Sequence, residues 1–168
     1  DRDPRRGLTG ARALENVADV VVIVLEDARE IGMTRPRAGD GDLRVAILTG
    51  RGDTFCAGMD LAEIGKLRSG VVDNEWLERV RKEPHVIYGA WLKTYRPTKP
   101  VILAAEGFAR AGGTEILQGT DIRVAAEDAV FGVTEVARGL YPMAGSTIRL
   151  RRQIPYCLAA EILLTGRH

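Results

Sequence analysis

Two glycine-rich turns place main-chain amides and a carboxylate where they could act on a carbonyl group. The first turn, TGRGDTFCAGMDL, occupies residues 49–61, and the second, EGFARAGGTEIL, occupies residues 106–117. Small residues at Ala57–Gly58 and at Gly112–Gly113 let a ligand approach the main chain closely. If both turns lie at one edge of a sheet, their N–H groups could converge as an oxyanion hole, which stabilises charge developing on a carbonyl oxygen.

The carboxylate is Glu115, directly after the second turn. A short helix starting near Gly112 would direct its positive end toward the same place. Glu115 is then either a catalytic group or a first-turn glutamate that the helix dipole stabilises. Both glycine-rich stretches could also be ordinary tight turns, and spacing alone does not separate these interpretations.

The sequence lacks the residues that other common kinds of catalytic centre need. The only serines are Ser69 and Ser146, and one of the two histidines, His168, is the last residue, so a Ser–His triad is not expected. No Cys/His cluster has zinc spacing, and no metal site is predicted. No G-x-G-x-x-G follows a strand, and Leu67 follows Gly-Lys where a phosphate loop needs Ser or Thr.

The elements that would position the turns alternate between strands and helices. Short buried strands are predicted at 44–50, 101–107 and 122–125. Helices are predicted over 72–84, 85–95, 112–119 and 149–166, with breaks at Pro84 and Pro155. This alternation favours an α/β fold whose strands expose their carboxyl ends as a site.

The N-terminal part is ambiguous. Apolar residues at 14, 17, 18, 21 and 25 predict a helix within residues 9–31, but the β-branched run VVVIV would also suit a strand. Residues 34–42, TRPRAGDGD, are predicted to form a surface loop.

Composition excludes several classes of partner. A chain of 168 residues with 45% hydrophobic and 28% charged residues is typical of one globular domain. A net charge of +1 gives no reason to expect nucleic acid or an anionic membrane as partner. The aliphatic run at 20–25 is too short to span a bilayer, and the first residues do not resemble a secretory signal. Cys56 and Cys157 are interpreted as reduced thiols of a cytoplasmic protein.

Taken in order, the motifs resemble the crotonase (enoyl-CoA hydratase/isomerase) superfamily. RVAILTGRGDTFCAGMDL is similar to the family's strand and turn ending in A-G-x-D-L. KPVILAAEGFARAGGTEILQGTDIRVAAEDAVFG is similar to its second glycine-rich segment, TEVARGLYPMAGSTIRL to the stretch ending in G-G-T-x-R-L, and AAEILLTGR to the next helix. Four motifs at matching spacing cover most of residues 44–167, so the resemblance implies a crotonase-like spiral of ββα repeats.

The resemblance also assigns roles by position. The oxyanion amides fall on Ala57 and Gly112, and the family's two hydratase glutamates fall on Glu115 and Glu135, 20 residues apart as the family pattern requires. Without the resemblance, Glu135 would be interpreted as a solvated turn residue. Hydratases keep both carboxylates, so the pair favours an enoyl-CoA hydratase, a lyase that adds water across the 2,3 double bond to give a 3-hydroxyacyl-CoA. Which glutamate is the acid stays open.

Further positions are implied to contact the substrate. They are Ala57, Gly58, Met59, Asp60, Gly112 and Met143. A bulky Met143, where glycine is common, would narrow the acyl pocket. Coenzyme A enters as part of the substrate, and no separate cofactor is implied. Arg51 and Lys66 could meet its phosphates, or they could simply keep the surface soluble.

The chain departs from the family pattern in places. Ala111 replaces the first glycine of the usual triplet, and Glu106 stands where a small polar residue is common. The family's first strand pair and its C-terminal helical region are not recognised. Residues 1–168 are therefore interpreted as a single crotonase-like core domain, truncated at both ends.

The resemblance implies a role in fatty acid and lipid metabolism and assembly as a homotrimer or hexamer. Two other enzyme activities of the superfamily stay open, enoyl-CoA isomerisation and thioester hydrolysis. A different class is open as well, since the chain could be a non-catalytic subunit that only binds acyl-CoA.

Overall fold

The larger of the two described sheets contains the strands that lead into the two glycine-rich turns. The computed structural model describes residues 13–17, 20–25, 44–50 and 53–168. Five strands lie in the order β1-β2-β3-β4-β6, with β1 antiparallel to β2 and the others parallel. They are β1 (Ala13–Val17), β2 (Val20–Leu25), β3 (Val45–Gly50), β4 (Val101–Ala105) and β6 (Ile122–Ala125). The parallel strands have nearly continuous apolar sequences, as is typical of strands covered on both faces, although β6 is exposed along its whole length.

A second, two-stranded sheet carries the site. Here β5 (Phe108–Arg110) pairs in parallel with β7 (Val130–Gly132). The chain leaves β4 for β5 through Gly107, whose φ is +56° and whose hydrogen faces the carbonyl oxygen of Asp53, only 1.9 Å from where a Cβ would lie. A residue with a side chain cannot take this position.

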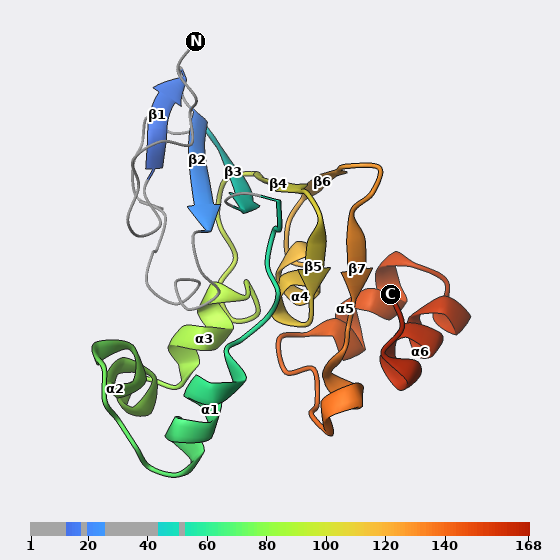
Figure 1. Cartoon of the computed structure of the whole chain (residues 1–168). Helices are drawn as coiled ribbons and strands as arrows, with labels where there is room; N and C mark the ends of the chain where they lie inside the picture. Colours follow the sequence, from blue (N-terminus) through green and yellow to red (C-terminus); the bar gives the residue numbers. More distant parts are fainter. Residues whose placement is uncertain (1–12, 18–19, 26–43, 51–52) are drawn as a thin grey trace.

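Helices follow β3, β5 and β7 in the described chain (Figure 1). They are α1 (Leu61–Arg68), α2 (Glu75–Lys82), α3 (His85–Ala90), α4 (Gly112–Leu117), the 3₁₀ turn η2 (Glu135–Arg138), α5 (Ser146–Gln153) and α6 (Tyr156–Thr165). In Figure 1, α1 to α3 lie together on one side of the molecule, and α5 and α6 lie beyond β7 on the other. Among the described residues, no helix is long and apolar enough to cross a membrane.

The main core lies where β3 and β4 meet α3 and α4. Leu48 and Leu103 are opposite each other in the register of these strands, and both are buried with Trp91 and Ile116 in one cluster. A smaller cluster around Val133 and Leu150 joins the segment before η2 to α5 and α6. The helix that carries Glu115, α4, contributes Ile116 to the main core.

The structure confirms several predicted elements. The strands predicted at 44–50, 101–107 and 122–125 are β3, β4 and β6, and the short helix after the second turn is α4. Pro84 and Pro155 stand immediately before α3 and α6, as expected from residues that cannot continue a preceding helix.

The structure decides or corrects the other predictions. Of the two interpretations of residues 9–31, the strand is right and the helix is wrong, because β1 and β2 form there and the β-branched run suits them. The helix expected over 85–95 ends at Ala90, and Leu92 follows with a left-handed φ of +54°. Helix α1 and the strands β5 and β7 were not expected from sequence. Residues 34–42 lie outside the described residues.

Candidate active site

The two glycine-rich turns lie side by side. Cys56 bridges to Ala109 of β5: its N–H donates to the Phe108 carbonyl at 3.0 Å, and its own carbonyl accepts from the Arg110 N–H at 2.9 Å. The segment after β3 thus runs as an extra strand along β5. It follows that Ala57, the next residue, is brought beside the turn that begins α4.

Two glycines allow this close approach. A Cβ on Gly113 would lie 2.6 Å from the carbonyl oxygen of Cys56, and a Cβ on Gly58 would lie 3.0 Å from the Cβ of Ala111 and 3.9 Å from the Gly112 nitrogen. Gly58 also has a left-handed φ of +102°. The two turns can approach this closely because Gly58 and Gly113 have no side chain.

The amides assigned to an oxyanion hole sit at this junction. The Gly112 N–H is at the first position of α4, where no intrahelical acceptor exists. Within the described part of the chain, neither it nor the Ala57 N–H donates to another backbone carbonyl. Ala57 is exposed and Gly112 is buried.

Ala111 holds the turn in a conformation that suits glycine. Its φ is +50° and its ψ is −120°, a region that costs a residue with a Cβ of the order of 1–3 kcal/mol. We expect Ala111→Gly to raise the free energy of unfolding by about 1 kcal/mol, because relief of strain exceeds the added entropy of the unfolded chain.

Urea denaturation measures this effect as a higher midpoint at an unchanged slope. Ala62→Gly, in the regular helix α1, is the matched control and should lower the free energy of unfolding by about 1 kcal/mol. Equal losses in both variants would show that Ala111 is not strained.

Glu115 is buried at the centre of the site. Its side chain is 2% exposed, and its two oxygens each accept a main-chain hydrogen bond of 3.0 Å, Oε2 from the Ala144 N–H and Oε1 from the Ser146 N–H. The Ser146 hydroxyl in turn accepts from Nε2 of Gln118 at 2.9 Å. Hydrogen bonds from N–H donors to both oxygens stabilise a carboxylate's negative charge and fix its orientation.

Glu135 faces this carboxylate from the first residue of η2. Burial raises the pKa of Glu135 to about 7, and the charge and contact of Glu115 add to the rise, whereas a backbone hydrogen bond opposes it. Its Oε2 is buried without a hydrogen-bond partner among the described residues. The two glutamates thus lie together in unlike environments, one held by amides and the other poorly solvated.

The raised pKa of Glu135 makes stability depend on pH. Below about 4.5 the group is protonated in both folded and unfolded chains; between 4.5 and about 7 only the folded chain keeps the proton, so stability is lost as pH rises through that window. We expect Glu135→Gln to stabilise the protein more at pH 8 than at pH 5, by roughly 1 kcal/mol because the side chain is only half-buried.

Urea denaturation at the two pH values checks this difference. Glu127→Gln, at an exposed carboxylate in the loop before β7, is the control and should give the same small effect at both. A pH-independent effect of Glu135→Gln would contradict the raised pKa.

Comparison with known proteins shows which family the chain belongs to. A model of the enoyl-CoA hydratase/isomerase family matches residues 21–168. The chain belongs to the enoyl-CoA hydratase/isomerase family. The fold is accordingly crotonase-like, as predicted, and solved members superpose well: EchA1_1 from Mycobacterium paratuberculosis gives a TM-score of 0.77 at 34% identity, covering 96% of this chain and 63% of that one.

Similar members of the hydratase/isomerase family include curated bacterial and fungal enzymes. Enoyl-CoA hydratase EchA19 of Mycobacterium tuberculosis is 55% identical over 129 residues, 77% of this chain and 47% of that protein. Mevalonyl-coenzyme A hydratase sidH of Aspergillus fumigatus is 43% identical over 124 residues, 74% of this chain and 43% of that protein. A carnitinyl-CoA dehydratase from Mycobacterium avium has a TM-score of 0.76 at 35% identity, covering 95% of this chain and 64% of its own. The chain thus spans about half the length of the curated relatives it matches.

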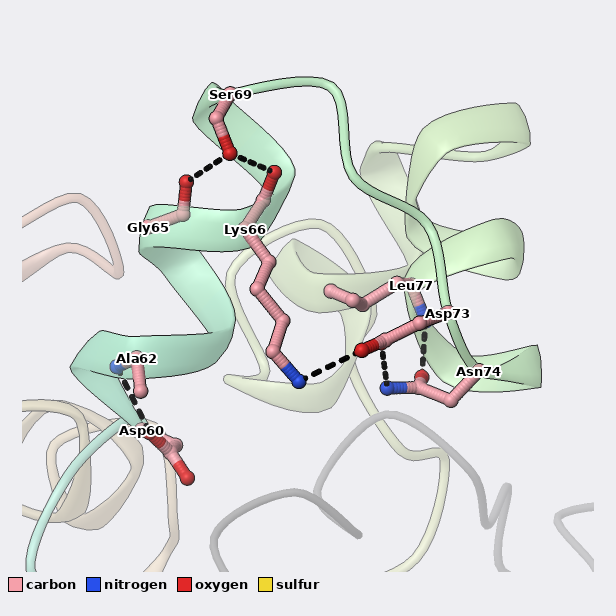
Figure 2. Close-up of polar contacts among 8 residues, drawn as sticks. All are labelled: Asp60, Ala62, Gly65, Lys66, Ser69, Asp73, Asn74 and Leu77. Carbon is pink, nitrogen blue, oxygen red and sulfur yellow. Dashed lines mark hydrogen bonds and ion pairs between the residues drawn. The ribbon is translucent and has the colours of Figure 1, made fainter.

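The other residues that the hydratase/isomerase resemblance assigned to substrate lie in varied settings. Asp60 stands directly before α1, and its Oδ1 accepts from the Ala62 N–H at 2.9 Å (Figure 2). Figure 2 also shows Lys66 reaching Asp73 at 2.9 Å, an ion pair that ties α1 to the start of α2. Met59 is half-buried against the main core. Arg51 lies outside the described residues.

Met143 lies beside the loop that binds Glu115. Its carbonyl oxygen accepts from Nζ of Lys93 at 2.5 Å, and its sulfur lies 4.0 Å from the Tyr88 hydroxyl. Met143 is 43% exposed. Met143 directly precedes Ala144, whose N–H binds Glu115. Its role in the acyl pocket stays a prediction.

Sequence reasoning missed the groups that support Glu115 in this family member. The Ser146 N–H binds Glu115 from 31 residues away, and Gln118 binds the Ser146 hydroxyl across 28 residues. Arg149 binds the Trp91 carbonyl, 58 residues away. Only the match of AGSTIRL to the family's G-G-T-x-R-L stretch could have drawn attention to Ser146 and Arg149. That match named no partner for any of these side chains.

Proposed function

We propose that the protein is an enoyl-CoA hydratase, which adds water across the 2,3 double bond of an enoyl-CoA thioester. The observation that carries the proposal is the facing pair of Glu115 and Glu135 beside two amides that no backbone carbonyl in the described chain accepts from. The relatives named above support it, because their names describe water addition to, or removal from, CoA thioesters.

The amides of Ala57 and Gly112 are proposed to bind the thioester carbonyl. This draws electron density from the double bond and makes Cβ electrophilic. As water adds, negative charge moves to the carbonyl oxygen, and the two N–H groups stabilise the resulting enolate. One such donor contributes about 10²–10³-fold in rate.

The unlike environments support a proposal for the two proton transfers. Glu115, whose two oxygens accept from the Ala144 and Ser146 amides, takes up a proton from the water as the water oxygen bonds to Cβ. Glu135, whose pKa is raised to about 7, is protonated in a large fraction of molecules at neutral pH and donates its proton to Cα. The enolate electrons form the new C–H bond, and the proton on Glu115 and the charge on Glu135 then re-equilibrate through water.

This chemistry calls on no group beyond these side chains and amides, and coenzyme A enters only as part of the substrate. As further parts of the proposal, Ala57–Asp60 and Met143 contact the substrate, the protein acts in fatty acid metabolism, and it assembles as a homotrimer or hexamer in the cytoplasm. These parts rest on the family resemblance.

Product analysis tests the proposal. The protein is incubated separately with 2-butenoyl-CoA and with 3-butenoyl-CoA. We expect the conjugated absorbance of the 2-enoyl thioester to fall as 3-hydroxybutanoyl-CoA forms, without release of free coenzyme A. Conversion of the 3-enoyl to the 2-enoyl thioester alone would indicate an isomerase, and release of the free thiol a hydrolase; either would overturn hydration as the main activity.

A further inference from the structure

Arg149 occupies a narrow slot next to the candidate site. It lies on α5, three residues after Ser146, and its side chain is half-buried between two glycines. A Cβ on Gly145 would lie 3.4 Å from Cδ and Nε of Arg149, and a Cβ on Gly119 would lie 2.9 Å from its Nη1. The guanidinium is thus confined between the end of α4 and the loop whose amides bind Glu115.

The guanidinium holds the turn that follows α3. Its Nη1 donates to the carbonyl oxygen of Trp91 at 3.3 Å, and its Nη2 donates to that of Leu92. Leu92 is one of two described non-glycine residues with positive φ, at +54°, so this turn is in a conformation that needs support from outside. A planar guanidinium suits two adjacent carbonyls because its donors diverge in one plane.

The turn after α3 packs against Gly112, whose amide is assigned to the oxyanion hole. The Trp91 side chain is 3% exposed, and its Nε1 would lie 3.0 Å from a Cβ on Gly112. The indole therefore packs directly on the Gly112 backbone. A shift of Trp91 would move the Gly112 N–H, and displacement of about 1 Å in a catalytic group can cost 10²-fold in rate.

The same residue also acts on the carboxylate. Burial lowers the pKa of Arg149, the negative charge of Glu115 opposes this, and the positive charge of Arg123 adds to it. Arg149 and Glu115 are therefore close enough for each charge to act on the other. Lys93 follows Leu92 in the sequence, and its Nζ donates to the Met143 carbonyl oxygen at 2.5 Å. This bond connects the same turn to the loop whose amides bind Glu115.

We propose, on the basis of the hydratase function proposed above, that Arg149 is a positioning residue that fixes the Gly112 amide through Trp91 and orients the loop that binds Glu115. It does not touch the substrate. Its contribution falls on the transition state, when charge gathers on the carbonyl oxygen and Glu115 takes up a proton. Substrate binding depends on it far less.

Steady-state kinetics of Arg149→Met and Arg149→Lys test the role in turnover. We expect Arg149→Met to lower kcat for hydration of 2-butenoyl-CoA by 10- to 100-fold with KM changed less than threefold. Lysine keeps the charge and can donate to one of the two carbonyls, so Arg149→Lys should recover part of the loss. Arg152→Met, at an exposed arginine on the same helix, should equal the wild type.

Fluorescence tests the positioning separately from activity. The sequence has two tryptophans, so in a Trp76→Phe background Trp91 is the only one. We expect Arg149→Met to shift Trp91 emission to longer wavelength and to raise its quenching by acrylamide at least twofold, with Arg149→Lys in between. Circular dichroism confirms that each variant is folded, and Arg149→Lys carries the test if Arg149→Met does not fold.

The outcomes separate the two proposals. A wild-type protein without hydration overturns the proposed function, while Trp91 fluorescence still decides whether Arg149 holds the turn. Unchanged Trp91 quenching in both variants, or a higher KM at constant kcat, would overturn the positioning role and leave the hydratase function standing.

Discussion

Glu115→Gln is expected to lower kcat for hydration by about 10³-fold while KM changes only a few-fold. The substitution removes the proposed acceptor of the water's proton. The thioester carbonyl would still bind the amides of Ala57 and Gly112, so ground-state binding is largely retained. The glutamine amide group also places N–H donors where Glu115 now accepts from Ala144 or Ser146, so one of these contacts becomes repulsive.

The same variant should act on the second carboxylate. Glu115 contributes to the raised pKa of Glu135 through its charge, so removing that charge lowers the pKa of Glu135. The remaining activity should therefore decline at a lower pH than in the wild type. Glu127→Gln, at an exposed glutamate, is the matched control. A kcat within threefold of the wild type would show that Glu115 is not the proton acceptor.

Gly113→Ala is expected to lower hydration by about 10²-fold or more, because it separates the two turns. The added methyl group would lie 2.6 Å from the Cys56 carbonyl oxygen and 2.9 Å from the Cys56 Cβ. The first of these is a main-chain atom that also accepts from the Arg110 N–H, so it cannot yield without breaking the pairing with β5. Overpacking of this kind costs about 1–3 kcal/mol in stability.

Gly65→Ala provides the control for this change. Gly65 lies in α1 with no atom within 4 Å of an added Cβ, so the alanine should leave kcat unchanged and raise stability slightly. Activity is compared per folded molecule, with the folded fraction taken from denaturation curves. Normal kcat in folded Gly113→Ala would show that hydration does not require the close contact of the turns.

The sequence predicted the parts of the fold that depend on local pattern. The apolar runs at 45–50 and 101–105 predicted strands, and proline fixed the starts of α3 and α6. Residues 13–25 were open between helix and strand, because their helical spacing competes with a β-branched run. Pairing with β3 decides it in favour of strands, and such pairing is a tertiary effect.

The candidate site divides in the same way. Motif matches in the sequence predicted the four candidate site residues, because a family motif consists of residues that lie near the same ligand. These residues are Ala57, Gly112, Glu115 and Glu135. The role proposed for each glutamate did not come from the motifs, because that proposal depends on the amides of Ala144 and Ser146 and on burial of the second carboxylate. Likewise, nothing local links Arg149 to carbonyls 57 and 58 residues away.

A crystal structure with 3-hydroxybutanoyl-CoA bound tests the central claim most directly. We predict that the thioester oxygen accepts hydrogen bonds from the Ala57 and Gly112 N–H groups, that the 3-hydroxyl lies against Glu115, and that Cα lies against Glu135. A thioester bound elsewhere, or one whose Cα and Cβ face away from both carboxylates, would contradict the account.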